Sequence, residues 1–123
     1  MNLGCFSISL TVKDIAKSKH FYEALGFTVY HGMEDQGWLI MKNGETNIGL
    51  FQGMIDNNIM TFNPGWNQDA QPMEPYDDVR KIQESLKAAG LTLDSEVEQN
   101  TQGPGSLSIT DPDGNQILLD QHV

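Results

Sequence analysis

The pattern of residues 14–26 returns in residues 78–90, and this repeat constrains the fold more than any other feature of the chain. Each segment begins with aspartate, continues with mostly apolar residues at helical spacing and ends with glycine. Aspartate caps a helix because its carboxylate accepts a backbone hydrogen bond, and glycine ends one because it readily adopts a left-handed conformation. The repeat therefore predicts two copies of one supersecondary unit, each containing a short helix.

Short strands are predicted around each helix. Residues 6–12 alternate apolar and hydroxyl side chains, which is typical of a strand with one apolar face. The dipeptides Asn43-Gly44 and Asp113-Gly114 predict tight turns at matching places in the two halves. Each half thus has the order strand, helix, strand, strand, strand. The strands are expected at residues 6–12, 27–30, 38–41 and 47–51, and again at 59–63, 91–97, 106–110 and 116–121.

Length and composition limit the classes of function. A chain of 123 residues has the length of one domain. Its net charge of −10 argues against nucleic acid, because phosphate binding needs a positive surface. No apolar run approaches the ~20 residues of a membrane span, and no signal segment is recognised. The single cysteine, Cys5, excludes an internal disulfide, so we expect a cytoplasmic protein.

One long connection separates the strand at 59–63 from the second helix. Residues 64–77 contain three prolines and two aromatic residues, Trp66 and Tyr76. Loops longer than ~12 residues inside compact domains are uncommon and are often functional. The alternatives are a flexible insertion and an ordered loop, and the prolines favour the ordered loop.

These motifs resemble the vicinal oxygen chelate superfamily, which includes glyoxalase I, extradiol dioxygenases and bleomycin resistance proteins. The resemblance rests on Ser-Leu-Thr-Val-Lys-Asp at 9–14, the Phe-Tyr and Leu-Gly-Phe that follow, and Asp-Pro-Asp-Gly-Asn at 111–115. It implies an α+β fold of two paired βαβββ modules that form an incomplete curled barrel around a ligand. Within a single domain at 1–123, the modules would lie near 1–53 and 57–123.

In the metal-using members of that superfamily, strands one, four, five and eight each supply one ligand, of the type His, Gln or Glu. By the motifs, these positions fall at Ser7, at Gly49, at Asn57 or Ile59, and at Leu118. Glycine and leucine have no donor atom, and serine is a weak ligand. Glyoxalase and dioxygenase chemistry needs a Lewis acid. We therefore predict no metal and no other cofactor.

Other catalytic arrangements have less support in the sequence. Asp120 and His122 would lie on one side of a strand and could bind zinc, but two ligands fall short of the three or four expected. The alternative is that His122 is frayed or exposed. Ser7 and Ser9 have no base placed near them, and Cys5 is expected at the edge of the core. The sequence thus leaves the catalytic residues unknown and favours a protein that is not an enzyme.

Side-chain alternation places polar and aromatic residues on the expected inner face. Aromatic rings with a few polar groups suit an organic ligand. A carboxylate such as Asp120 beside a tryptophan favours a planar cation. Core packing is the alternative explanation for Trp38, Phe51 and Leu118. The predicted ligand-binding residues are Ser7, Ser9, Trp38, Phe51, Thr61, Asn63, Trp66, Leu118 and Asp120.

The chain is most similar in character to the bleomycin-resistance branch, whose members are small, acidic, metal-free and dimeric, and sequester a cationic drug. We predict a cytoplasmic homodimer that binds a small organic ligand without metal, a cationic or aromatic compound, with a role in antibiotic resistance. No nucleic acid or membrane partner is expected. A competing hypothesis is a glyoxalase- or dioxygenase-type enzyme, a lyase or oxygenase, with a non-standard metal or acid–base site. A third is a degenerate paralogue with a regulatory or structural role.

Overall fold

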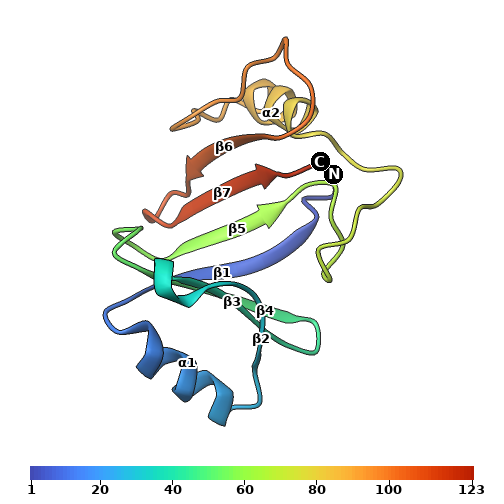
Figure 1. The fold of residues 1–123 in the computed structure, drawn as a ribbon. Helices are drawn as coiled ribbons and strands as arrows, with labels where there is room; N and C mark the ends of the chain where they lie inside the picture. Colours follow the sequence, from blue (N-terminus) through green and yellow to red (C-terminus); the bar gives the residue numbers. More distant parts are fainter. The chain divides into compact units, whose positions relative to one another are not determined.

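The computed structural model describes residues 1–123 and contains two compact units. The N-terminal unit is Ser7–Ile59, and the C-terminal unit combines Met1–Phe6 with Met60–Val123. Each unit has its own apolar core. Figure 1 shows the helices and strands of both units.

The N-terminal unit is a mixed sheet with one helix. Its strand order is β2-β3-β4-β1, in which β1 runs parallel to β4 and the other neighbours are antiparallel. The elements are β1 (Cys5–Val12, whose first two residues belong to the C-terminal unit), α1 (Ile15–Ala24), β2 (Thr28–Met33), the 3-10 helix η1 (Glu34–Gln36), β3 (Trp38–Asn43) and β4 (Thr46–Gln52).

Helix α1 covers one face of this sheet. The Asp14 carboxylate accepts a hydrogen bond from the Lys17 amide and caps the helix, as the repeat predicts. The buried apolar side chains are Ile15, Leu39, Met41, Ile48 and Leu50. Because side chains alternate along a strand, the residues between these point to the face opposite α1. That second face includes Ser9 and Gly49, which are paired across β1 and β4.

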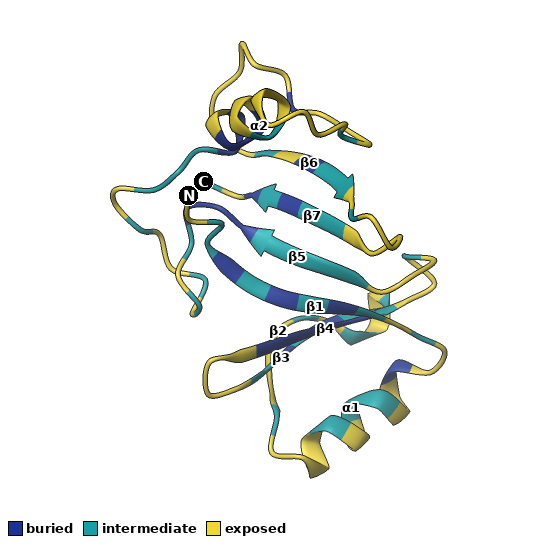
Figure 2. Ribbon diagram, turned by 180° about the vertical axis from the view of Figure 1, so that it is seen from behind, coloured by how far each residue is buried: buried dark blue, intermediate teal, exposed yellow.

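The C-terminal unit contains the strand order β5-β7-β6 and one helix. Its elements are β5 (Ile59–Asn63, of which Ile59 belongs to the N-terminal unit), α2 (Val79–Ala88), β6 (Gly105–Thr110) and β7 (Gln116–Gln121). The buried side of α2 packs against the sheet, and the opposite side is exposed (Figure 2). The core side chains are Val79, Ile82, Val97, Leu107 and Leu119.

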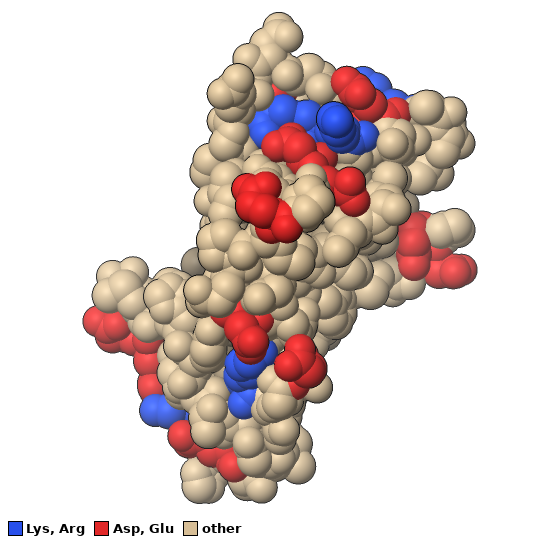
Figure 3. Space-filling view, turned by 90° about the vertical axis from the view of Figure 1, so that its right-hand side faces the viewer, with Lys and Arg blue, Asp and Glu red and all other residues tan.

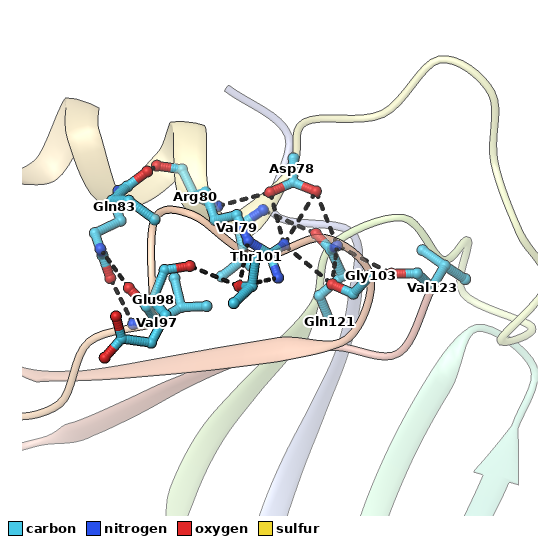
Figure 4. A network of polar contacts seen from close by, with 11 residues as sticks. Asp78, Val79, Arg80, Gln83, Val97, Glu98, Thr101, Gly103, Gln121 and Val123 are labelled. Carbon is cyan, nitrogen blue, oxygen red and sulfur yellow. Dashed lines mark hydrogen bonds and ion pairs between the residues drawn. The ribbon is translucent and has the colours of Figure 1, made fainter.

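A buried polar network joins the start of α2 to the end of β7 (Figure 4). Gln121 is fully buried; its side-chain oxygen accepts from the Val79 amide at 2.8 Å, and its nitrogen donates to Asp78 Oδ2 at 3.0 Å. Arg80, 7% exposed, donates to the same carboxylate and to the Gly103 carbonyl. Buried polar groups are stable only when they are hydrogen-bonded, so this network fixes the position of the last strand.

The predicted strand at 91–97 is wrong. The segment makes only an isolated bridge between Ser95 and Ser108. The Gln83 side chain explains why, because it accepts from the Val97 amide at 2.8 Å and donates to the Val97 carbonyl at 2.9 Å. A side chain thus satisfies both backbone groups that a neighbouring strand would otherwise bind.

The rest of the predicted element order is confirmed, as is the α+β fold class. Strands β5 and β7 have the predicted bounds, and β2 continues to Met33, beyond the predicted end at residue 30. Neither α1 nor α2, at ten residues each, has the length and apolar content to cross a bilayer.

Candidate functional site

The metal-ligand position expected on β4 is Gly49, and the ring of Phe51 fills the space beside it. A Cβ atom added at Gly49 would lie 2.6 Å from Phe51 Cε2 and 3.4 Å from Ile40 Cδ1. Carbon atoms in contact normally stay ~3.5–4.0 Å apart. A carboxylate side chain at this position therefore has no room unless the Phe51 ring moves.

The other expected metal positions are no better suited. Leu118 lies on β7 opposite Ser108 and has only aliphatic carbon to offer. Asn57 is exposed in the connection before β5, and Ile59 is the first residue of that strand. No group of three or more His, Cys, Asp and Glu side chains is gathered as a metal site. The residues at the superfamily's positions do not fit a divalent metal.

In the N-terminal unit, four predicted ligand-binding residues share the sheet face opposite α1. Ser7 and Ser9 alternate with the apolar residues of β1 and are 8% and 7% exposed. Trp38 and Phe51 are directly paired across β3 and β4. The structure thus places these four residues on one face, as alternation predicts.

Two polar residues on this same face were missed by sequence reasoning. Lys42 on β3 is paired with Asn47 on β4, and its ammonium donates to the Asn47 side-chain oxygen at 3.0 Å. The ammonium also lies 5.7 Å from the ring centre of Tyr30. Alternation from Trp38 and Phe51 would have placed both residues on this face.

In the C-terminal unit, the loop at 64–77 is folded back on itself, which confirms the expected ordered loop. A bridge pairs Trp66 with Pro72, and the Asn67 amide donates to the Gln71 carbonyl at 2.9 Å. The Gln68 side chain binds both the amide and the carbonyl of Phe6, at 2.9 and 2.7 Å. These hydrogen bonds hold the loop against the first strand within the unit.

The loop brings Trp66 against the end of β7. Its indole ring stacks on the imidazole of His122, with ring centres 4.5 Å apart and planes inclined by 6°. His122 Nε2 lies 3.2 Å from Asp120 Oδ2. The Asn63 side chain donates to the Asp120 carbonyl at 2.8 Å. The structure therefore brings together three predicted ligand-binding residues, Asn63, Trp66 and Asp120.

His122 is the member of this cluster that the sequence did not assign to a ligand site. The spacing of Leu118, Asp120 and His122 indicated that they share one side of the strand. The partner of His122 was not recognisable, because Trp66 lies far away in the sequence. Thr61, also predicted to bind ligand, lies two residues before Asn63 on β5 and has the same facing.

The charge of His122 is favoured by its surroundings. The hydrogen bond with the Asp120 carboxylate raises the pKa of His122 above its usual 6.5, and partial burial opposes this rise. A protonated imidazole parallel to an indole face gains cation–π attraction in addition to the ion pair. The cluster can therefore hold a planar cation, and a histidine paired with a carboxylate can also exchange a proton.

Charge is dispersed on the face drawn in Figure 3. Figure 3 shows acidic side chains in several separate groups on one face, with basic side chains among them. This dispersal agrees with the scattered acidic residues of the sequence. The net charge of −10 would attract cations at long range.

The fold and these sites define a duplicated α+β protein whose expected metal positions carry weak ligands or no donor atom at all. A model of the Glyoxalase/Bleomycin resistance protein/Dioxygenase superfamily matches residues 5–119. The chain belongs to this superfamily, also known as the vicinal oxygen chelate superfamily. None of the curated proteins is significantly similar to it in sequence.

Solved structures with nearly the same length share the fold. A superfamily member from Vibrio splendidus 12B01 matches with a TM-score of 0.64 and 15% identity, over 94% of this chain and 97% of the other. A Legionella pneumophila protein described as an NAD-dependent benzaldehyde dehydrogenase matches at 0.69 and 15%, over 96% and 99%. A Streptomyces coelicolor methylmalonyl-CoA epimerase matches at 0.61 and 16%, over 99% of both chains. Identities this low, with such different activities, show the fold alone.

Proposed function

We propose that this protein binds a small organic molecule without a metal ion and sequesters a cationic or aromatic compound. The observation that carries the proposal is the Phe51 ring, which fills the space that a side chain at Gly49 would need. Leu118, at the position expected to supply the metal ligand of strand eight, supports the proposal. An aliphatic side chain can line a binding site for an organic molecule but cannot coordinate a metal ion. The polar and aromatic side chains that each unit contributes to the predicted ligand-binding residues suit an organic ligand.

Metal analysis of the purified protein tests the first half of the proposal. We expect well below one equivalent of any transition metal after dialysis without chelator, and no change in melting temperature on adding EDTA. One tightly held equivalent that is lost in Asp120→Ala, but kept in the exposed-site control Asp56→Ala, would contradict the proposal.

A thermal-shift screen tests the second half. The compounds should include aromatic cations, glycopeptides and neutral aromatics of matched size. A ligand at a hundredfold excess over its Kd stabilises the folded state by about 2.7 kcal/mol. That corresponds to about 10 °C in melting temperature for a chain of this size. If no compound raises the melting temperature, sequestration loses its support.

A second candidate function is acid–base catalysis, and one observation favours it. The Asp120 carboxylate holds His122 at 3.2 Å, and a carboxylate that orients an imidazole is a common arrangement for a general base. Because one structural neighbour is a methylmalonyl-CoA epimerase, its substrate is the first to test. Deuterium incorporation from solvent into methylmalonyl-CoA, present with the wild type and lost in His122→Ala, would favour the enzyme. No incorporation would leave binding as the function.

We propose a cytoplasmic homodimer as the form in which the protein acts. Apolar side chains are exposed on the N-terminal unit, chiefly on α1 and the edge strand β2, and a partner would remove them from water. These exposed side chains include Phe21, Leu25, Val29, Tyr30 and Met33. Light scattering after gel filtration should give twice the mass of one chain, and the mass of a single chain would contradict the dimer.

A further inference from the structure

The stacked pair of Trp66 and His122 has the geometry that a bound planar cation would adopt. The imidazole lies parallel to the indole at 4.5 Å, and one of its nitrogens lies 3.2 Å from the Asp120 carboxylate. A planar cation on an aromatic face, with an N–H directed to a carboxylate, gains both cation–π attraction and a charge-assisted hydrogen bond. His122 therefore satisfies the requirements that the sequence assigned to an external ligand.

The backbones of Trp66 and Asp120 are held by hydrogen bonds that do not involve His122. Trp66 is fixed by its bridge to Pro72 and by its amide, which donates to the Asn63 carbonyl at 3.2 Å. Asp120 is fixed within β7, opposite Ser106, and its carbonyl accepts from the Asn63 side chain. Removing the imidazole would leave both backbone segments in place, so the indole and the carboxylate would still project from neighbouring positions and could receive another planar cation.

The cluster is also accessible from solvent. The side chains of His122 and Asp120 are 45% and 38% exposed. A histidine side chain leaves such a position by rotation about its own bonds, without movement of the strand. A soluble ligand can thus reach the indole face once the imidazole swings away.

We propose that Trp66 and Asp120 form a binding site for a planar monocation, and that His122 occupies this site in the ligand-free protein. This inference rests on the proposed binding function and specifies its ligand. The ligand is a delocalised cation with in-plane N–H groups: an amidinium, a guanidinium or a protonated nitrogen heterocycle. Such a cation replaces the imidazole on the indole face and donates to the carboxylate in its place.

Benzamidinium is a suitable probe, because it joins an amidinium to an aromatic ring, and benzamide is its neutral counterpart of the same shape. Isothermal titration calorimetry at pH 7 should compare the wild type, His122→Ala, Asp120→Asn and the control His20→Ala. His20 is exposed on α1, in the other unit. The His122 imidazole competes with benzamidinium for the indole face, and an exposed cation–π contact of ordinary strength corresponds to about fivefold in affinity. We therefore expect His122→Ala to bind benzamidinium about fivefold more tightly than the wild type and His20→Ala do.

A measurement on the wild type keeps the inference testable if His122→Ala is unstable. The Trp66 ring current shields the His122 ring protons in the stacked state, so their NMR signals should move downfield as benzamidinium is added. Signals that stay in place at saturation would overturn the inference. Binding that is unchanged in Asp120→Asn, or benzamide that binds as tightly as benzamidinium, would overturn it as well.

The outcomes separate this inference from the proposed function. If benzamidinium binds the wild type and His122→Ala equally well, His122 does not occupy the site, while binding of a small molecule stands. If His122→Ala gains affinity as expected but no compound in the thermal-shift screen stabilises the wild type, the site exists and the proposed sequestration fails.

Discussion

The packing of Phe51 over Gly49 gives a quantitative prediction for the substitution Gly49→Ala. The new Cβ would meet Phe51 Cε2 at 2.6 Å, so the ring must shift. Overpacking of this kind costs about 1–3 kcal/mol. Alanine also restricts the unfolded chain more than glycine does, which returns about 0.5–1 kcal/mol. The net expectation is a loss of about 1 kcal/mol in the free energy of unfolding.

The sign of this effect should reverse when the ring is removed. In a Phe51→Ala background nothing opposes the new methyl group except Ile40 Cδ1 at 3.4 Å, which is an ordinary contact. Gly49→Ala should then stabilise the protein by about 0.5–1 kcal/mol. The double-mutant cycle should therefore show a coupling energy of about 1–3 kcal/mol between positions 49 and 51.

Urea denaturation followed by circular dichroism measures all four proteins of the cycle. Gly105→Ala is a matched control, because its Cβ would meet Val97 in the C-terminal unit, so its effect should be the same with and without Phe51. If Gly49→Ala changes the free energy of unfolding equally in the wild type and in Phe51→Ala, the Phe51 ring does not fill the space beside Gly49. The proposed function would then lose the observation that carries it, and only the missing donor atom of Gly49 would argue against a metal on β4.

Three further predictions concern the C-terminal unit. Gln121→Ala should lower the free energy of unfolding by roughly 2–3 kcal/mol, because it leaves buried hydrogen-bonding groups without partners; urea denaturation measures the loss. Burial alone would raise the pKa of Asp78, but hydrogen bonds from Gln121 and Arg80 lower it below 3.8. The stabilisation from this carboxylate is complete above pH 3.8 and should be lost as the pH falls through the folded-state pKa, as acid unfolding will show. The pKa of His122 should exceed 6.5 in an NMR titration and fall in Asp120→Asn.

Each of these three has a contradicting outcome. A Gln121→Ala protein as stable as the wild type would mean that water replaces the lost hydrogen bonds. An acid-unfolding curve that is identical for Asp78→Asn and the wild type would remove Asp78 from the network. A His122 pKa that does not change in Asp120→Asn would show that the two side chains are not paired in solution.

The sequence alone determined the fold class and almost the whole order of elements. Helix caps, stop glycines and hairpin dipeptides are local signals, since each depends on the conformation of one or two residues. Asp14 and Asp78 cap their helices as expected, and β7 has its predicted bounds. The one wrong strand, at 91–97, failed because a distant side chain, Gln83, binds the backbone there. The residue types at the metal positions were also readable from the chain.

Only the tertiary structure decided what surrounds those positions. Phe51 fills the space beside Gly49 because of its side-chain rotamer. The spacing of residues along the sequence does not fix a rotamer. The contact between Trp66 and His122 joins residues from the loop and the end of β7. Such a contact depends on how the loop folds back, and no periodicity encodes it. The sequence thus predicted that Trp66 and Asp120 bind a cationic ligand. In the structure, the protein's own His122 contacts both of these side chains.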